Sequence, residues 1–309
     1  MCKILSCLIK PNKMMKFLFV IGFLVGASVQ DNINATDGSQ YLYKAIESGR
    51  VDVVTFLIDN GANVNTLYET YVNEFYDSRF TPLLLAVVKG NTDIVKTLIE
   101  HGADVNYVIP VHKKEINALH IATMFDKLEI CKILIANGIN VNVEDNEKFT
   151  PLHTAALYGS NDTVEYLVAH GANITAEDVY MNTPLHLAAL NGNLKTCKSL
   201  IEHGAAINAK DKENSTPLFY AAGFGTKELA EYLITHGANI NAICKDMMTP
   251  LHMAYYYDNK EVQQFLIDSG ADQNAKDEEY KTPREMDAEK GKKEKLKIIA
   301  YLNGSKRIL

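Results

Sequence analysis

The chain has 309 residues, a formal net charge of −7 and 9% aromatic residues, with no tryptophan. Outside residues 1–30, this is the composition of an ordinary soluble globular protein. The negative charge argues against binding to nucleic-acid phosphates, which proteins neutralise with Lys and Arg, and five cysteines are too few for a disulfide scaffold in a chain of this length.

Residues 1–30 differ in kind from the rest of the chain. Four lysines and no acid precede residue 17, the run from Phe17 to Val25 is entirely apolar, and small residues follow at 26–28. This order is typical of a secretory signal peptide. The apolar stretch ends at Val29 after 13 residues, whereas a helix that spans a bilayer needs about 20. We therefore expect a cleaved signal and a secreted, periplasmic or surface-exposed protein; an uncleaved membrane anchor and a misassigned start are the alternatives. Cleavage would remove the four lysines and change the net charge from −7 to −11.

Behind a polar linker at 31–39, a repeat organises the chain. Thr-Pro recurs five times at intervals of 33 residues, from Thr150-Pro151 to Thr282-Pro283, and Asn117 holds the same place 33 residues before Thr150. Thr81-Pro82 lies 36 residues further upstream. A fixed period of this size indicates a repeat array, which forms one elongated body. The predicted array spans 40–309, with units that start near residues 40, 81, 117, 150, 183, 216, 249 and 282.

The unit from 183 to 208 predicts two helices and a loop. Thr183 can cap the first helix by accepting a backbone N–H, and Pro184 suits the first helical position, where no N–H is needed. Small and apolar residues at 185, 188 and 189 form a stripe that a neighbouring helix can approach closely. Gly192 lies in the break before a second amphipathic helix, and Gly204 supplies a residue that can turn left-handed at its end.

Thr-Pro-Leu-His at 183–186 and His-Gly-Ala-x-x-Asn at 203–208 make this unit resemble the ankyrin repeat. The resemblance implies an all-α solenoid of stacked helix–turn–helix units with loop or β-turn fingers, made of seven full units and a C-terminal capping unit. It also implies that the histidines of Thr-Pro-Leu-His form hydrogen bonds within and between units. It favours a module that binds other proteins, although a fold by itself does not determine function.

Two stretches depart from the regular pattern. The insertion at 66–80 carries Tyr71 and Tyr76 among further aromatic and acidic residues. It either folds onto the array or contacts a partner, since insertions in repeat proteins often gather on the binding face. In the last unit, Arg284 and Glu285 replace the Leu-His pair, as a terminal unit with a polar outer face would require. We interpret the basic stretch 289–297 as the solvated face of a capping helix pair.

The sequence shows no pattern typical of catalysis or metal binding. Cys131 and Cys197 take a repeat position that valine fills elsewhere, so we predict that they are core residues. Eight of the nine histidines follow the repeat. Equivalent residues lie a helix-packing distance of about 8–10 Å apart, whereas zinc ligands lie about 2 Å from the ion. Gly223–Lys227 lacks the Gly-Lys-Ser/Thr order of a phosphate-binding loop. We therefore predict no enzyme activity, no cofactor and no bound metal.

The resemblance places partners on the concave surface, which the first helices and the loop tips form. At the second position after the Ala-Ala pair, four of seven units carry an aromatic residue. A row of rings favours a protein interface, because aromatic residues are enriched there; the alternative is that the rings pack into neighbouring units as core. We expect a spacing of about 10 Å per unit along this row, with a gap at Asn191. The predicted partner-binding residues are Phe125, Tyr158, Phe224, Tyr257, Tyr256, Met124, Phe149, Met248, Tyr71 and Tyr76.

The predicted function is that of an exported, monomeric and non-catalytic scaffold that binds a partner protein of unknown identity on its concave face. Two alternatives stay open. Arrays of this kind behind a signal segment resemble effectors of intracellular bacteria, so the protein could be a secreted effector or toxin-like regulator that masks a host protein. If residues 17–29 are not cleaved, the array becomes a membrane-tethered scaffold.

Overall fold

The computed structural model describes residues 39–69, 79–111, 114–158, 161–286 and 288–296. The predicted signal, most of the linker and the two insertion tyrosines, Tyr71 and Tyr76, lie outside these residues. Within the described ranges, no helix combines the length and the hydropathy that crossing a membrane requires.

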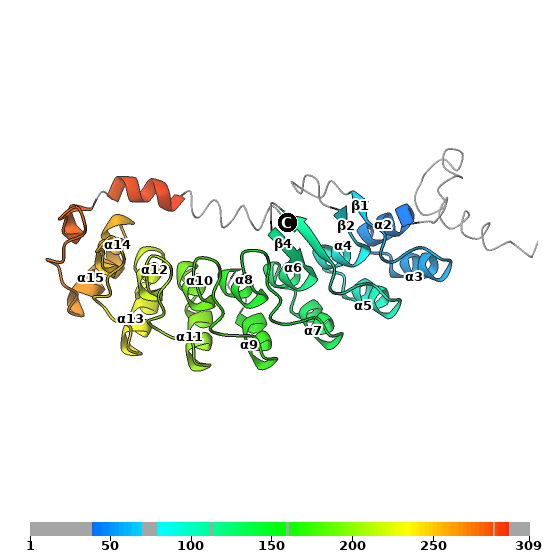
Figure 1. Cartoon of the computed structure of the whole chain (residues 1–309), viewed down its shortest axis with the longest axis horizontal. Coiled ribbons are helices and arrows are strands. Elements are labelled where there is room, and N and C mark those ends of the chain that lie inside the picture. Colours follow the sequence, from blue (N-terminus) through cyan, green and yellow to red (C-terminus); the bar gives the residue numbers. More distant parts are fainter. Residues whose placement is uncertain (1–38, 70–78, 112–113, 159–160, 287, 297–309) are drawn as a thin grey trace, which may run out of the picture.

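The described residues contain seven helix pairs that stack into one curved array, with the first helices along its inner side and the second helices along its outer side (Figure 1). Each helix contacts its counterpart in the next pair, which confirms the predicted all-α repeat solenoid. The first helices are α2 (Ser39–Glu47), α4 (Pro82–Lys89), α6 (Ala118–Met124), α8 (Pro151–Tyr158), α10 (Pro184–Leu190), α12 (Pro217–Phe224) and α14 (Pro250–Tyr256). The second helices are α3 (Val51–Asp59), α5 (Thr92–Glu100), α7 (Leu128–Ala136), α9 (Asn161–Ala169), α11 (Leu194–Glu202), α13 (Lys227–Thr235) and α15 (Lys260–Asp268).

Capping residues decide where the helices begin. Asn117 accepts hydrogen bonds from the backbone N–H groups of Leu119 and His120 at 3.0 and 3.1 Å. Thr81 does the same for the N–H of Leu84 at 3.3 Å. These bonds satisfy donors that have no partner inside the helix. At the other end of the pair, the predicted left-handed turn is present at Gly204, whose φ is 96°.

Buried histidines join four of the units to the next. The Nδ1 atom of His153 accepts the backbone N–H of Thr150 at 3.2 Å, and its Nε2 donates to the carbonyl of Asn182, in the next unit, at 3.0 Å. A neutral ring with its proton on Nε2 makes both bonds. Burial lowers the pKa of His153, which favours this neutral form. The bonds implied by the family resemblance are thus confirmed, and they recur at His120, His186 and His252.

Apolar side chains between the two helix layers form a continuous core along the array. Leu185 of α10 is completely buried, and α10 packs against both α8 and α12. Cys131 and Cys197 are also completely buried, as predicted. Burial raises the pKa of each thiol to about 12, so both behave as apolar core residues.

The loops between the later pairs fold into fingers, and an aspartate holds the base of most of them, whereas Cys244 takes its place in one. Asp211 accepts hydrogen bonds from the backbone N–H groups of Glu213 and Ser215, both at 2.8 Å, and it is buried. Asp145 and Asp178 hold their fingers in the same way. These three carboxylates are buried in their loops, so they are not part of an acidic surface.

Two longer loops carry antiparallel hairpins. Strand β1 (Tyr68–Glu69) pairs with β2 (Arg79–Phe80), and β3 (Val108–Val111) pairs with β4 (Lys114–Asn117). At its described ends the insertion folds onto the array, because Tyr68 stacks on Tyr43 with ring centroids 4.1 Å apart and Phe80 is completely buried.

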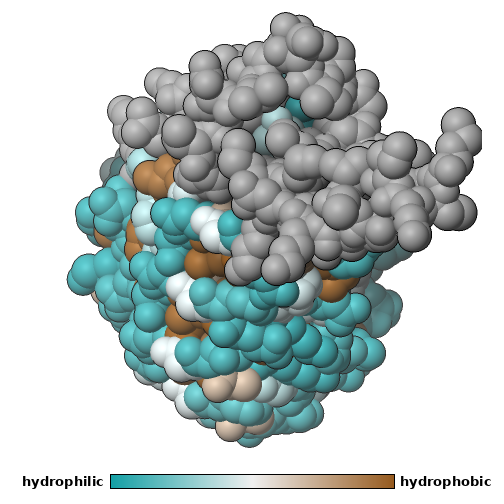
Figure 2. Space-filling view, turned by 90° about the vertical axis from the view of Figure 1, so that its right-hand side faces the viewer, coloured by the Kyte–Doolittle hydropathy of each residue, from teal (hydrophilic) through white to brown (hydrophobic). Residues whose placement is uncertain are grey.

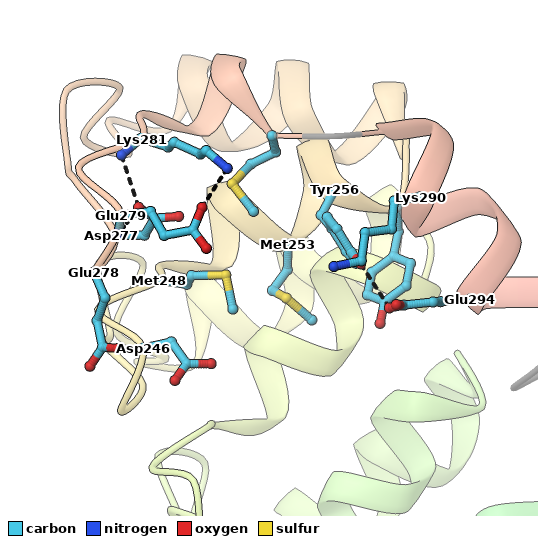
Figure 3. A pocket seen from close by; sticks show the side chains of 12 residues that line it. Asp246, Met248, Met253, Tyr256, Asp277, Glu278, Glu279, Lys281, Lys290 and Glu294 are labelled. Atoms are coloured by element: carbon cyan, nitrogen blue, oxygen red, sulfur yellow. Dashed lines mark hydrogen bonds and ion pairs between the residues drawn. The ribbon is translucent and has the colours of Figure 1, made fainter.

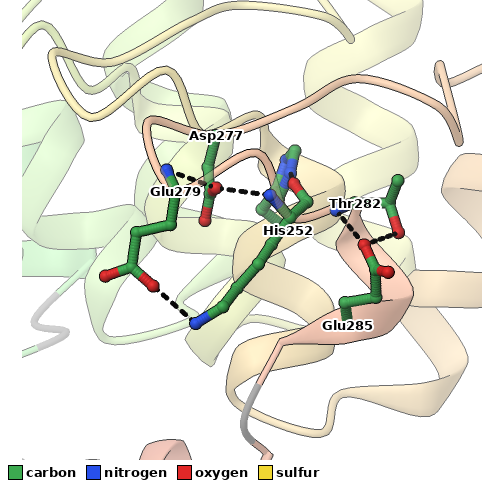
Figure 4. A network of polar contacts seen from close by, with 6 residues as sticks. His252, Asp277, Glu279, Thr282 and Glu285 are labelled. Atoms are coloured by element: carbon green, nitrogen blue, oxygen red, sulfur yellow. Dashed lines mark hydrogen bonds and ion pairs between the residues drawn. The ribbon is translucent and has the colours of Figure 1, made fainter.

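The eighth unit differs from the predicted helix pair. A short 3-10 helix, η1 (Pro283–Glu285), takes the place of the first helix, and a helix at 288–296 turns back over the inner side of α14 and α12 (Figure 1). Glu285 replaces the histidine and accepts hydrogen bonds from the backbone N–H and the hydroxyl of Thr282 at 2.7 and 2.8 Å (Figure 4). The carboxylate therefore keeps the cap but lacks the Nε2 donor with which His252 reaches the next unit.

The other end of the array is closed by α2 and α3. Seen from that end and outside the grey atoms, the surface is mostly hydrophilic, with small and separate hydrophobic patches (Figure 2). Such a polar end face suits a terminal unit, which has no neighbour to cover it.

Candidate partner-binding surface

Four of the predicted residues occupy equivalent places where first helices end. Tyr158 and Phe224 are the last residues of α8 and α12, and Phe125 and Tyr257 directly follow α6 and α14. All four are half-buried. Asn191 holds the same place after α10 and is exposed, so the row contains the predicted gap.

Three rings at the C-terminal end of this row form an aromatic cluster, which we define as Phe224, Tyr256 and Tyr257. The centroids of Phe224 and Tyr257 lie 4.5 Å apart with an interplanar angle of 46°, and Tyr256 meets Tyr257 edge-on at 5.0 Å. The expected spacing of about 10 Å per unit is therefore wrong for this pair, because long side chains on neighbouring helices lean toward each other. Centroid distances of roughly 4.5–7 Å are those of favourable aromatic pairs.

Gly223 makes room for one ring of the cluster. A Cβ at position 223 would lie 2.6 Å from the Cδ2 atom of Tyr257. The glycine sits in α12, and Thr226 caps the next helix by accepting the N–H of Leu229 at 3.3 Å. The break between the two helices of the unit therefore lies within Gly223–Lys227, and Gly223 itself makes room for the Tyr257 ring.

The other predicted residues are placed differently. Phe149 stacks on His153 with ring centroids 5.1 Å apart, so its ring supports the histidine that joins two units. Met124 is half-buried in α6. Met248 is half-buried and lines a hollow beside the aromatic cluster. The two insertion tyrosines lie outside the described residues.

The helix at 288–296 lies against the aromatic cluster. The Tyr256 hydroxyl donates to Oε2 of Glu294 at 2.8 Å. The Nζ atom of Lys295 donates to the carbonyl of Gly223 at 2.8 Å and lies 5.6 Å from the centre of the Phe224 ring. Burial lowers the pKa of Lys295. The interpretation of 289–297 as a solvated face is therefore wrong for Lys295.

A hollow of about 640 Å³ opens beside the cluster, between the last fingers, α14 and the helix at 288–296 (Figure 3). Met248, Met253 and Tyr256 supply its apolar wall. An apolar wall under an acidic rim fits a basic side chain, whose aliphatic stem packs while its charged end meets carboxylates. The acids that line the hollow are Asp246, Asp277, Glu278, Glu279 and Glu294, and the lysines are Lys281 and Lys290.

Sequence reasoning missed a second exposed row, at the tips of the fingers. Met181, Met247 and Tyr280 share one repeat position and have positive φ angles of 60°, 59° and 62°. Left-handed backbone favours Gly or Asn at such a turn, so these large side chains are held in an unfavourable conformation. Tyr280 is 78% exposed, and Tyr180, which directly precedes Met181, is 57% exposed. The 33-residue repeat could have revealed this row, because it places Met181, Met247 and Tyr280 at equivalent turn positions.

In the part of the chain that the structure describes, no group of His, Cys, Asp and Glu residues could hold a metal ion. Both ring nitrogens of His153, His186 and His252 are engaged in hydrogen bonds with their own unit and the next. The nitrogens of these rings are therefore used for hydrogen bonds within the array.

A model of the family described as "Ankyrin repeats (3 copies)" matches the chain at residues 5–109, 107–178 and 185–277. No curated protein matches the chain.

Proposed function

Because the chain belongs to the ankyrin repeat family, whose members generally mediate protein–protein interactions and are typically non-catalytic, we propose that it is an exported, monomeric scaffold that binds a partner protein on its concave face. The observation that carries this proposal is the aromatic cluster of Phe224, Tyr256 and Tyr257 at the ends of α12 and α14, two of the first helices that line the inner side of the array (Figure 1). Its rings are half-buried, so they combine a fixed position with accessible apolar surface. Aromatic residues are enriched at the centres of protein interfaces.

A preformed surface is the physical basis of this recognition. The rings stand at the ends of helices whose caps, core and histidine bonds hold them in place. A surface that is already ordered loses little conformational entropy when a partner binds, so more of the contact energy appears as affinity. The array thus binds as a rigid multi-unit surface and needs no chemical step.

Site-specific photo-crosslinking in the native host tests where the partner binds. A photoreactive phenylalanine analogue replaces Tyr158 on the inner side in one variant and Tyr166 on the outer helix α9 in the other. Tyr166 is the matched control, because it belongs to the same unit and is also half-buried, with its ring stacked on His170. We expect one protein to be crosslinked from position 158 and not from 166. Equal crosslinking from both positions would contradict a concave-face site.

Single alanine variants then separate binding from stability. Tyr158→Ala and Phe224→Ala should each weaken the crosslinked partner's affinity, by ~2 kcal/mol or more at a hot spot, with a small change in melting temperature. Tyr166→Ala should leave the affinity unchanged. If the inner variants lower the melting temperature strongly and leave binding intact, the rings are core residues.

We also propose that residues 1–30 direct export and are removed. The support is the order of lysines, apolar run and small residues in the sequence. Mass spectrometry of the protein from its native host should find a mature chain that begins between Ala27 and Asn32. A soluble cytosolic chain that still carries Phe17–Val25 would rule out export.

A further inference from the structure

The helix at 288–296 approaches the aromatic cluster through a glycine. Gly291 is buried, and a Cβ at this position would overlap the carbonyl oxygen of Tyr256 and lie 3.1 Å from its Cδ1 atom. The φ angle of Gly291 is not left-handed, so the backbone conformation does not demand glycine. Closeness does. Glycine also weakens a helix relative to alanine. At position 291 the sequence therefore allows the contact with Tyr256 at the expense of helix stability.

One face of the helix makes the contacts. Glu294 and Lys295 follow Gly291 by three and four residues, which places all three on the same side of a helix. Glu294 accepts the Tyr256 hydroxyl bond, and Lys295 reaches the Gly223 carbonyl and the Phe224 ring. The opposite side, with Lys293, is exposed.

The same contacts make the helix easy to displace. Its contacts with the array come from a glycine and three charged residues, since Lys292 also pairs with Asp258 at 3.0 Å, and its one leucine, Leu296, is 67% exposed. A helix this short is marginal in water without apolar burial. The acid-rimmed hollow beside it also stays open, since Lys290 and Glu294 line that hollow without filling it (Figure 3).

We propose that the aromatic cluster and the adjoining hollow form a helix-binding groove that helix 288–296 occupies within the same chain, and that a basic partner helix binds there by displacing it. This inference rests on the proposed function and names the kind of partner. The partner helix has a small residue where Gly291 lies and a lysine or arginine four residues later, over Phe224. A further long basic side chain enters the hollow, which keeps four carboxylates and one lysine once the internal helix has left with Lys290 and Glu294.

Displacement of the internal helix can be tested in the full chain with Gly291→Ala. The added methyl collides with Tyr256, so the helix should leave the cluster even though alanine raises its intrinsic helicity. Amide exchange over 288–296 should accelerate at least tenfold. Lys293→Ala is the control, because this lysine lies on the exposed side of the same helix. Lys295→Ala removes a contact without adding volume and should accelerate exchange in the same direction.

A labelled peptide with the sequence of residues 286–298 then probes the groove. It should bind the Gly291→Ala chain at least tenfold more tightly than the wild-type chain, whose own helix blocks the site. Phe224→Ala in the Gly291→Ala chain should abolish this binding. A peptide carrying Lys290→Glu should bind at least tenfold more weakly, because the rim of the hollow is acidic.

Two results would overturn the proposal. One is unchanged exchange over 288–296 in both Gly291→Ala and Lys295→Ala. The other is a helix that is released while the peptide binds neither chain. The failure of this proposal can be distinguished from the failure of the proposed function. If the peptide binds the groove while the native partner still binds the Phe224→Ala chain, the groove is supported, and the partner-binding site proposed above is rejected.

Discussion

Leu185→Ala tests whether the repeats act as a linear array. The Leu185 side chain is completely buried in α10, which packs against α8 and α12. The substitution removes three carbon atoms, and at about 0.8 kcal/mol per buried CH₂ the lost transfer free energy is roughly 2.4 kcal/mol. The cavity left between tightly packed helices adds to this, so the expected loss is about 3–5 kcal/mol.

The loss should be local. Coupling in a repeat array runs between nearest neighbours, so amide exchange should accelerate in the pairs α8–α9, α10–α11 and α12–α13. A local loss of about 3 kcal/mol corresponds to exchange faster by roughly 100-fold or more, since each 1.4 kcal/mol is a factor of ten. The pairs α2–α3 and α14–α15 should change little.

Leu67→Ala is the matched control for Leu185→Ala. It removes the same atoms from a residue that is 41% exposed, so it should cost about 1 kcal/mol or less. Uniform loosening of all seven pairs after Leu185→Ala would refute nearest-neighbour coupling. No loss of stability at all would refute the position of Leu185 between the units.

Three further predictions concern stability. Gly223→Ala forces the Tyr257 ring to move and should cost about 1–3 kcal/mol; an unchanged tyrosine signal in near-ultraviolet circular dichroism would contradict this. Asp211→Ala removes the acceptor of two finger N–H groups and of the Tyr220 hydroxyl, which donates at 2.6 Å. Urea unfolding should show a loss of about 1–3 kcal/mol, against about 0.5 kcal/mol or less for the exposed Glu213→Ala. Folding lowers the pKa of His153, His186 and His252, so below about pH 6.5, the ordinary histidine pKa, the unfolded chain binds more protons than the folded chain. Acidification should therefore lower the melting temperature as the pH falls through about 6.5. A melting temperature that stays constant from about pH 7 to 5 would contradict this.

Features that each unit encodes locally could be predicted from the sequence. The cap at Asn117, the left-handed turn at Gly204 and the bond from His153 to the next unit each depend on residues that recur at the repeat period. Their partners lie at fixed offsets in the chain, such as the 29 residues from His153 to Asn182. Periodicity therefore carries both the fold and the contacts between neighbouring units.

Contacts without a period could not be predicted in the same way. The bond from Lys295 to Gly223 joins residues 72 positions apart and occurs at one place in the array. The close approach of Phe224 to Tyr257 depends on side-chain directions, and sequence spacing indicates only the distance between their helices. The row of rings was thus predictable as a repeat position, whereas the cluster at one end of it was not.

The composition of the last unit explains why the array ends as it does. A further first helix would need an apolar stripe to bury against α14, but the unit has Arg284 and Glu285 where the regular units have Leu and His. The helix at 288–296 has no such stripe either, so it can dock only through small and polar contacts, with Gly291 against Tyr256 and Lys295 over Phe224. Contacts of this kind cover a surface without adding much to the core. The polar residues that end the array therefore also leave the aromatic cluster covered only by the weakly held helix 288–296, which a better-fitting helix can replace.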